Sequence, residues 1–245
     1  MRQYSIDARN IKNPIYPCPI KMGGKNANGQ MLSIGNYYLS LNGKPFFGIC
    51  GEAHFSRMDR ELWEDEIIKM KAGGLNIIAT YIFWIHHEEI EGTFDFSGNK
   101  DLRFFLELCK KNNMYVILRI GPFSHGECRN GGFPDWMYGQ PFDIRCDDPS
   151  YLFYTRRFYE QIYQQAKGLL FKDNGPVIGV QLENEHEHAS CPWEMTTENS
   201  KEWVVSGHDG KNHMNTLKQM ALEIGFDVPL YTATAWGGAC APEDT

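Results

Sequence analysis

Short apolar runs alternate with segments of helical periodicity along most of the chain beyond residue 46. The runs consist mainly of β-branched, aromatic and other apolar residues, as buried strands do, and they lie at residues 47–50, 75–81, 115–120, 177–182 and 229–234. Between them, apolar side chains recur at helical spacing, which predicts helices over residues 60–71, 102–113, 149–169 and 217–224. The pattern therefore predicts a repeated strand–helix unit.

Turn and capping residues mark the ends of several of these segments. Asn42-Gly43 separates two short apolar runs and predicts a β-hairpin ahead of the first unit. Asp148-Pro149 predicts an N-cap and the first position of a long helix, and Gly73-Gly74 predicts the end of an earlier one. Residues 1–36 are predicted to be an irregular lead-in, and residues 37–245 to be one domain.

Polar residues follow the first four predicted strands, at the point where each strand ends. They are Glu52 and His54, Tyr81 and Trp84, Arg119, and Asn184 and Glu185. Such residues gather at the C-terminal face of (β/α)8 barrels. No GxGxxG or P-loop pattern follows a strand, which disfavours a doubly wound nucleotide-binding sheet. We therefore predict an α/β fold of the (β/α)8 TIM-barrel type, with only about the first five β/α units present and two open sheet edges.

The composition argues against several classes of partner. The chain has 24 Lys and Arg residues against 31 Asp and Glu residues, a formal net charge of −7, whereas nucleic-acid binding needs a basic surface. No apolar run approaches the ~20 residues that span a bilayer, so we expect neither nucleic acid nor membrane as a partner. The first residues lack the apolar core of a signal peptide, although a periplasmic or secreted parent is an alternative. The 7 Cys residues form no CxxC pair, which favours reduced thiols.

The run over residues 177–185 ends in the most informative polar residues of the chain. An apolar strand gives way to a carboxylate, the amide of Asn184 and the carboxyl of Glu185. At the end of a barrel strand, Glu185 can protonate a leaving glycosidic oxygen, and Asn184 can hold a sugar hydroxyl. The alternative is that both residues only cap the following segment. Glycosidases generally use two carboxyl groups, so a second one is expected elsewhere.

Four segments of the chain resemble glycoside hydrolase family 35, the β-galactosidase family of the retaining Asn-Glu barrel clan. Their order and spacing match the family, and together they extend over about residues 37 to 235. The segments are Gly51-Glu52-Ala53-His54-Phe55-Ser56-Arg57, Thr80-Tyr81-Ile82-Phe83-Trp84, residues 119–136 with Glu127, and Gln181-Leu182-Glu183-Asn184-Glu185.

The resemblance implies roles for four residues and a reaction. Glu185 matches the general acid/base, Asn184 its substrate-binding neighbour, Tyr81 a contact to galactose, and Glu127 a carboxylate that binds sugar hydroxyls. The implied activity is that of a retaining glycoside hydrolase that removes terminal β-D-galactose from β-galactosides, with a carbohydrate as its partner. The family's nucleophile is a Glu near the end of a seventh strand. We expect it beyond residue 245 and expect the 245 residues alone to be inactive.

Several positions depart from the family's usual pattern. The family commonly has Asn and Pro where Ile85 and Glu89 stand, Cys-Ala-Glu-Trp at residues 125–128, and Tyr-Gly at His186-Glu187. These positions fall in sugar-facing loops, so the sugar stays open. A family relative acting on glucosamine or another pyranose is the alternative to a β-galactosidase.

Further residues are weaker candidates for the site. His125 lies where a sugar hydroxyl could be bound, and Trp84 could stack on a sugar face, with packing beneath the loops as its alternative role. Arg119 is expected to orient a neighbouring carboxylate rather than contact the sugar. Glu52 and Glu88 are either pocket carboxylates or structural ion-pair partners.

One cluster suggests a metal site, and it consists of His186, Glu187, His188 and Cys191. Its spacing matches no established ligand pattern, so we expect no metal and no cofactor. A metal-dependent hydrolase would rest on this cluster alone. A non-catalytic carbohydrate-binding fragment or pseudoenzyme is the other alternative, motivated by the missing second carboxylate.

Overall fold

A sheet of five short parallel strands forms the centre of the molecule. The computed structural model describes residue 5, residues 14–18, 24–186 and 210–234, and the backbone of residues 193–196 and 204–207. The strands are β4 (Cys50–Glu52), β5 (Ile77–Tyr81), β6 (Tyr115–Gly121), β7 (Val177–Leu182) and β10 (Leu230–Tyr231). They lie side by side in chain order, and every neighbouring pair is parallel. This order is that of a (β/α) barrel and confirms the predicted fold class, a partial barrel of the TIM type.

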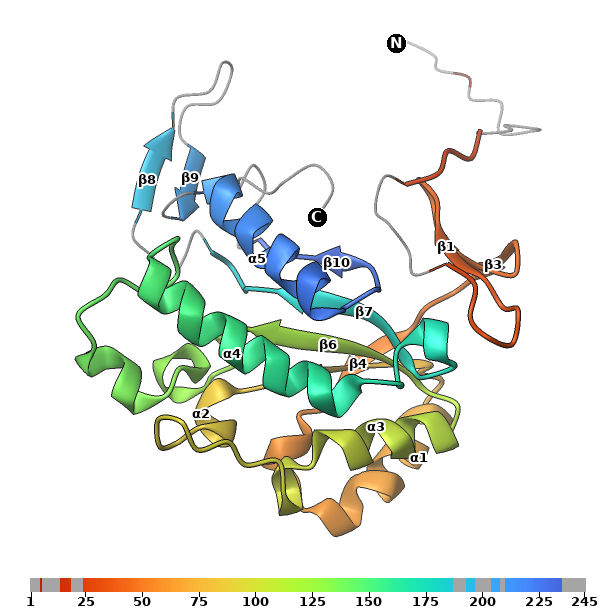
Figure 1. Ribbon diagram of the computed structural model, residues 1–245. Helices are drawn as coiled ribbons and strands as arrows, with labels where there is room; N and C mark the ends of the chain where they lie inside the picture. Colours follow the sequence, from red (N-terminus) through yellow and green to blue (C-terminus); the bar gives the residue numbers. More distant parts are fainter. Residues whose placement is uncertain are drawn as a thin grey trace.

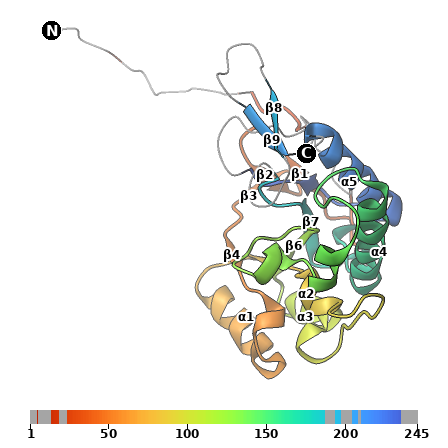
Figure 2. The same ribbon diagram turned by 90° about the vertical axis from the view of Figure 1, so that its left-hand side faces the viewer.

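Four helices form a layer over one face of this sheet (Figure 1). They are α1 (Trp63–Ala72), α3 (Leu102–Lys111), α4 (Pro149–Ala166) and α5 (Gly210–Ile224), and each follows one of the first four strands. Consecutive helices contact each other, and Figures 1 and 2 both show α4 beside α5. A further short helix, α2 (Trp84–His87), follows β5 directly. Short 3₁₀ turns lie at Phe55–Arg57, Arg60–Leu62, Gly98–Lys100, Arg129–Gly132, Asp135–Gly139 and Phe171–Asp173.

Side chains of the strands alternate between two apolar layers. On β6, Val116 and Leu118 belong to the large core beneath the helices. Ile117 points to the opposite face, where it packs with Ile178 of β7 and with Leu32. Successive side chains of a strand point to opposite faces of the sheet. One set therefore packs against the helices, and the other set faces the barrel interior.

A small antiparallel sheet closes the interior near the N-terminal ends of the strands. It consists of β1 (Leu32–Ile34), β2 (Leu39–Leu41) and β3 (Lys44–Phe46). The predicted hairpin is confirmed, since Asn42 and Gly43 join β2 to β3 with φ of 55° and 73°, as a two-residue turn of type I′ requires. The division at residue 36 stays a prediction, although β1 pairs with β2 across it.

Several predicted elements differ from the structure in their bounds. The first strand was expected to be buried at residues 47–50, but β4 covers Cys50–Glu52 and Phe47 is 82% exposed. Phe47 belongs to no strand, because residues 47–49 connect β3 to β4, and β4 itself is an edge strand with only β5 beside it. The helix expected from residue 60 begins with a 3₁₀ turn, and α1 starts at Trp63. Two strands that the sequence pattern did not indicate, β8 (Trp193–Thr196) and β9 (Val204–Gly207), form a separate hairpin.

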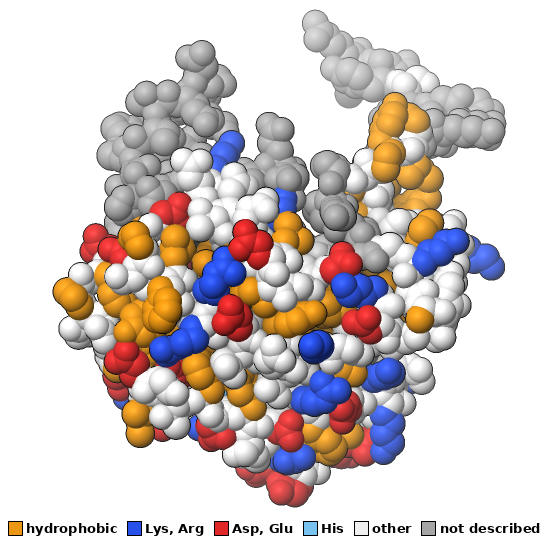
Figure 3. Space-filling model, in the orientation of Figure 1, with side chains coloured by type: hydrophobic (Ala, Val, Ile, Leu, Met, Phe, Trp, Pro, Cys, Tyr) orange, Lys and Arg blue, Asp and Glu red, His pale blue; other side chains and the backbone are white. Residues whose placement is uncertain are grey.

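The surface mixes charges of both signs. On the face shown in Figure 3, Lys and Arg side chains lie among Asp and Glu side chains, with apolar side chains between them. Among the described residues, no helix has both the length and the apolar character that crossing a bilayer requires.

Candidate active site

A row of polar side chains crosses the inner face of the sheet at the C-terminal ends of four strands. The register pairs Tyr81 with Arg119, Arg119 with Gln181, and Gln181 with Tyr231. Residues in register on parallel strands share a face, so these side chains form one layer of the barrel interior. The Arg119 guanidinium lies 3.7 Å from the centroid of the Tyr81 ring.

The side-chain amide of Asn184, just beyond β7, rests on this row. Its oxygen accepts hydrogen bonds from Tyr81 Oη (3.2 Å), Arg119 Nη2 (2.8 Å) and Gln181 Nε2 (3.2 Å). Burial raises the pKa of Tyr81 to about 12, so its hydroxyl stays a donor. Because three donors occupy the amide oxygen, the amide orientation is fixed and its NH2 group faces away from the row. Asn184 is therefore set to donate to a bound hydroxyl.

Arg119 carries out the orienting role that the sequence predicts. It forms an ion pair with Glu52 in addition to its contact with Asn184, so Glu52 is an ion-pair partner. His54 accepts a hydrogen bond from the Tyr81 backbone (3.3 Å), and burial lowers the pKa of the imidazole. His54 is thus a neutral, hydrogen-bonded residue beside the row.

Glu185 follows Asn184 directly beyond β7 and is half-buried. Its backbone nitrogen donates to the carbonyl of Ala233 (2.9 Å), which ties it to the chain after β10. The charge of Glu185 contributes to the raised pKa of Tyr81, so the carboxylate lies within electrostatic range of that hydroxyl. The structure thus brings the predicted residues Tyr81, Asn184 and Glu185 together.

His125 and Glu127 lie on a tight loop after β6. His125, Gly126 and Glu127 have φ of 57°, 52° and 48°, a left-handed conformation that residues other than glycine rarely adopt. A Cβ atom at Gly126 would lie 2.8 Å from the Phe83 ring, so only glycine fits there. Arg57 Nη2 holds the loop by donating to the Gly126 carbonyl (2.8 Å). The loop leaves His125 half-buried and Glu127 exposed.

A cavity of about 640 Å³ opens beside this loop. Three of the positions that depart from the family pattern, Ile85, Glu89 and Cys128, line it together with Glu127. The remaining lining residues are Arg57, His86, Ile90, Arg129 and Asp135. These three departures therefore share one cavity with a predicted sugar-binding residue.

Trp84 does not reach the site, which corrects its predicted role in substrate binding. It has no exposed surface, its ring stacks on Phe158 at 4.5 Å, and its Nε1 donates to Glu88 (2.7 Å). The reason is that α2 turns the side chain outward, against α4. Glu88 is itself fully buried and paired with Arg157, so it is a structural ion-pair partner.

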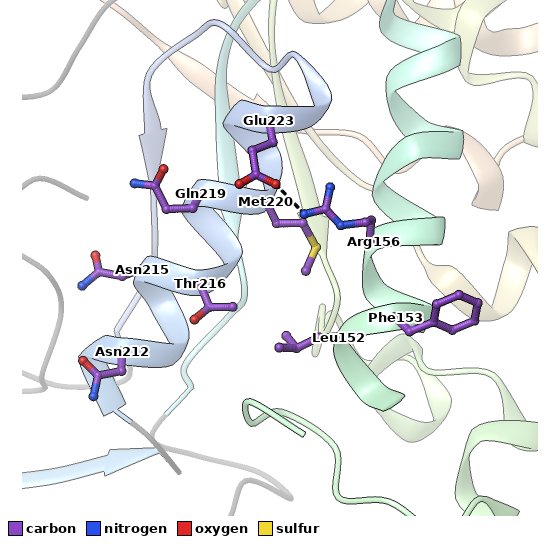
Figure 4. A pocket seen from close by; sticks show the side chains of 9 residues that line it. All are labelled: Leu152, Phe153, Arg156, Asn212, Asn215, Thr216, Gln219, Met220 and Glu223. Carbon is purple, nitrogen blue, oxygen red and sulfur yellow. Dashed lines mark hydrogen bonds and ion pairs between the residues drawn. The ribbon is translucent and has the colours of Figure 1, made fainter. Parts of the chain in front are cut away.

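A second hollow, of about 690 Å³, lies in the outer layer of helices (Figure 4). It runs between α4 and α5, and the ion pair of Arg156 with Glu223 crosses it. Its other lining residues are Leu152, Phe153, Asn212, Asn215, Thr216, Gln219 and Met220. It lies apart from the strand ends that carry the candidate residues.

The structure adds one residue that the sequence pattern did not single out. Arg145 is fully buried in the loop before α4, and its guanidinium binds both carboxylate oxygens of Glu183. It also donates to the backbone carbonyls of Asn184 and Glu185. A lone Arg in an irregular loop gives no periodic or motif signal that could have revealed this contact.

Of the cluster that suggested a metal site in the sequence, only His186 is described. Burial lowers the pKa of this imidazole to about 4, and its Nε2 donates to the Arg145 carbonyl (2.8 Å). Glu187, His188 and Cys191 lie outside the described residues. Within the part of the chain that the structure describes, no group of three or more His, Cys, Asp or Glu side chains is placed to hold a metal ion.

Sequence comparisons relate the chain to one family of enzymes. A profile described as "Glycosyl hydrolases family 35" matches residues 38–242. A β-galactosidase of Xanthomonas manihotis is 36% identical over 169 residues, which cover 69% of this chain and 28% of that protein. The human β-galactosidase is 38% identical over 167 residues, 67% of this chain and 25% of that protein. The chain thus spans about a quarter of the length of these relatives.

Solved structures resemble the chain in fold. An exo-β-1,4-mannosidase from Opitutaceae bacterium strain TAV5 matches with a TM-score of 0.56 at 14% identity, covering 86% of this chain and 34% of that one. A GH5_18 protein from Bifidobacterium longum subsp. infantis matches with a TM-score of 0.51 at 11% identity, covering 74% and 40%. At such identities the likeness concerns the fold alone.

Proposed function

The chain belongs to glycosyl hydrolases family 35, and from this premise we propose that the protein is a retaining glycoside hydrolase that removes terminal β-D-galactose from β-galactosides. The names of the two β-galactosidases support galactose as the sugar. Since the chain covers only part of those proteins, both the activity and the substrate belong to this proposal.

The observation that carries the proposal is the arrangement of Asn184 and Glu185 at the end of β7. The amide oxygen of Asn184 is occupied by donors from three neighbouring strands, which aims its NH2 group at a ligand. The carboxyl of Glu185 comes directly after it, at the strand end where barrels keep their chemistry. A sugar hydroxyl on Asn184 would place the adjacent glycosidic oxygen near Glu185.

In the proposed reaction, Glu185 acts twice. It first protonates the leaving oxygen while a nucleophilic carboxylate attacks the anomeric carbon, which forms a glycosyl-enzyme. It then takes a proton from the water that hydrolyses this intermediate. The family pattern places the nucleophile at the end of a seventh strand, whereas the described parallel sheet has five strands. Of the two catalytic carboxyl groups, the proposal therefore assigns only the acid/base, Glu185. The inactivity of the 245 residues alone stays a prediction.

Three further residues are proposed to bind the sugar. Tyr81 lies beside Asn184 in the row of polar side chains. His125 and Glu127 lie on the tight loop after β6, and both have a left-handed backbone conformation. Tyr81 and Asn184 at the strand ends, and His125 and Glu127 on the loop, would then each bind hydroxyl groups of the sugar.

A different sugar is the second candidate function. Ile85, Glu89 and Cys128 depart from the family pattern and line the same cavity. Glu89 already pairs with Lys100 (3.4 Å), but the exposed carboxylate of Glu127 in that cavity would suit a cationic group, so a glucosaminide is the substrate to compare with a galactoside.

The test uses the natural protein that contains residues 1–245 and a panel of nitrophenyl β-glycosides. We expect the galactoside to be hydrolysed fastest, and Glu185→Gln to lower kcat by ~10²- to 10⁴-fold, because hydrolysis of the glycosyl-enzyme needs Glu185 as general base even where the nitrophenyl group leaves with little help from an acid. Glu160→Gln is the matched control, since Glu160 is exposed on the outer surface of α4.

The panel also separates the alternatives. Full activity in Glu185→Gln would contradict the assigned acid/base. Faster hydrolysis of the glucosaminide would replace galactose as the sugar. Binding of galactose without turnover of any glycoside would favour the carbohydrate-binding alternative.

A further inference from the structure

Arg145 holds three consecutive residues at the end of β7. Its Nε and Nη2 atoms lie 3.0 and 2.7 Å from the two carboxylate oxygens of Glu183. The same Nη2 lies 3.0 Å from the carbonyl oxygens of Asn184 and of Glu185. These two carbonyls belong to the peptide groups on either side of the Glu185 Cα atom, so the guanidinium binds the backbone from which that side chain projects.

The backbone that Arg145 holds is in an unfavourable conformation. Glu183 and Glu185 have φ of 54° and 48°, a left-handed angle that is strained at a residue other than glycine. Such angles persist only where surrounding contacts fix them. Glu183 N donates to the Gly121 carbonyl (2.7 Å), and Asn184 N donates to the Glu183 carboxylate (2.9 Å). That carboxylate is in turn bound by Arg145, which makes the guanidinium the centre of these contacts.

Contacts with neighbouring residues fix Arg145 and its loop. Its guanidinium lies 3.7 Å from the centroid of the Phe123 ring, and its carbonyl accepts a hydrogen bond from His186 Nε2 (2.8 Å). Two residues later, Asp147 accepts a hydrogen bond from His213 of α5 (2.7 Å). The loop therefore links the end of β7 to two helices of the outer layer, α4 and α5.

We propose that Arg145 is a positioning residue for the acid/base, acting through the peptide groups on either side of Glu185. The inference rests on the proposed function. A buried ion pair is weak evidence of a gain in stability, so its main effect here is to fix geometry. Lysine could not replace it, because a single ammonium nitrogen cannot span the two carboxylate oxygens and two carbonyls that the planar guanidinium reaches.

A residue that positions Glu185 and a residue that only stabilises the fold can be distinguished by how their loss changes the hydrolysis rates of two substrates. A methyl β-galactoside has a poor leaving group that needs a proton from Glu185, whereas a dinitrophenyl β-galactoside leaves without one. Misplacing the acid therefore slows the first substrate selectively. Loss of folded protein slows both equally, so the ratio of the two kcat/KM values, measured in one preparation, is independent of the folded fraction.

The experiment measures this ratio in the natural protein that contains residues 1–245. In Arg145→Lys we expect the ratio of methyl to dinitrophenyl substrate to fall ~10- to 100-fold, the scale of a 1 Å misplacement. Glu185→Gln should change it in the same direction. Arg156→Lys is the matched control, because Arg156 pairs with Glu223 on the outer helices, and its ratio should match wild type.

An equal loss on both substrates in Arg145→Lys would overturn the inference and leave Arg145 a structural residue. If that variant does not fold, Glu183→Gln takes its place, since it removes the charge that holds the guanidinium and should lower the same ratio. An unchanged ratio in Glu183→Gln would then overturn the inference. A wild-type protein that hydrolyses neither substrate would overturn the proposed function, and the inference with it.

Discussion

At the scale of single residues, the orientation of one amide is set by residues from three strands. Tyr81 ends β5, Arg119 lies on β6 and Gln181 on β7, and each donates to the same oxygen of Asn184. None of them needs to contact a substrate to influence binding, because each decides which side of the amide faces the ligand.

The Tyr81 hydroxyl provides a direct check of this arrangement. Tyr81→Phe removes one donor to Asn184 while keeping the ring beside the Arg119 guanidinium. Loss of a neutral hydrogen bond costs roughly 0.5–1.5 kcal/mol, so we expect kcat/KM for a nitrophenyl β-galactoside to fall by ~3- to 10-fold. Tyr115→Phe, on β6 near the other end of the sheet, is the control. Equal kcat/KM values in the two variants would contradict the role of Tyr81.

The sequence indicated Asn184, Glu185 and Tyr81 because each stands at the end of an apolar run. It could not place Arg145, whose partner Glu183 lies 38 residues away along the chain. Nor could the sequence decide the direction of Trp84. The single helical turn after β5 determines whether its ring faces the barrel interior or packs beneath the outer helices. Contacts between distant loops and the orientation of short turns are the parts that only the structure supplies.

At the scale of elements, strands that are apolar on both faces were the most predictable. The predicted run at residues 177–182 coincides with β7, and the run at 115–120 with most of β6. The first strand differed because residues 47–49 form a connection from β3 to the edge strand β4, and Phe47 is exposed in that connection. Apolar composition predicts a strand, whereas its burial depends on neighbours far along the chain.

The N-cap of α4 gives a prediction for stability. The Asp148 carboxylate accepts a hydrogen bond from the backbone nitrogen of Ser150 (2.8 Å) at the start of this helix. Asp148→Ala should lower the free energy of unfolding by ~1 kcal/mol, as measured by urea denaturation. Asp59→Ala is the control, because Asp59 precedes a 3₁₀ turn without a side-chain capping bond. A loss in Asp148→Ala no larger than in the control would show that this cap does not stabilise the helix.

At the scale of the whole molecule, the two ends of the sheet differ in the side chains that they carry. Near the N-terminal ends of the strands, Leu32 and its small antiparallel sheet pack on Ile77 and Ile178. At the C-terminal ends, the polar row faces the interior, and Asn184 and Glu185 follow directly after β7. This division between a packed end and a chemical end is the general property of barrel enzymes. Within the described residues, β4 and β10 are the two open edges that the strand count predicted.

The central claim is that Glu185 is the acid/base of a retaining hydrolase, and azide rescue of Glu185→Ala tests it most directly. In the natural protein that contains residues 1–245, azide should accelerate turnover of a dinitrophenyl β-galactoside by this variant and yield β-galactosyl azide. The reason is that the small anion attacks the glycosyl-enzyme without a general base. Wild type and Glu160→Ala should show no such acceleration. Formation of α-galactosyl azide, or no acceleration in Glu185→Ala, would contradict the account.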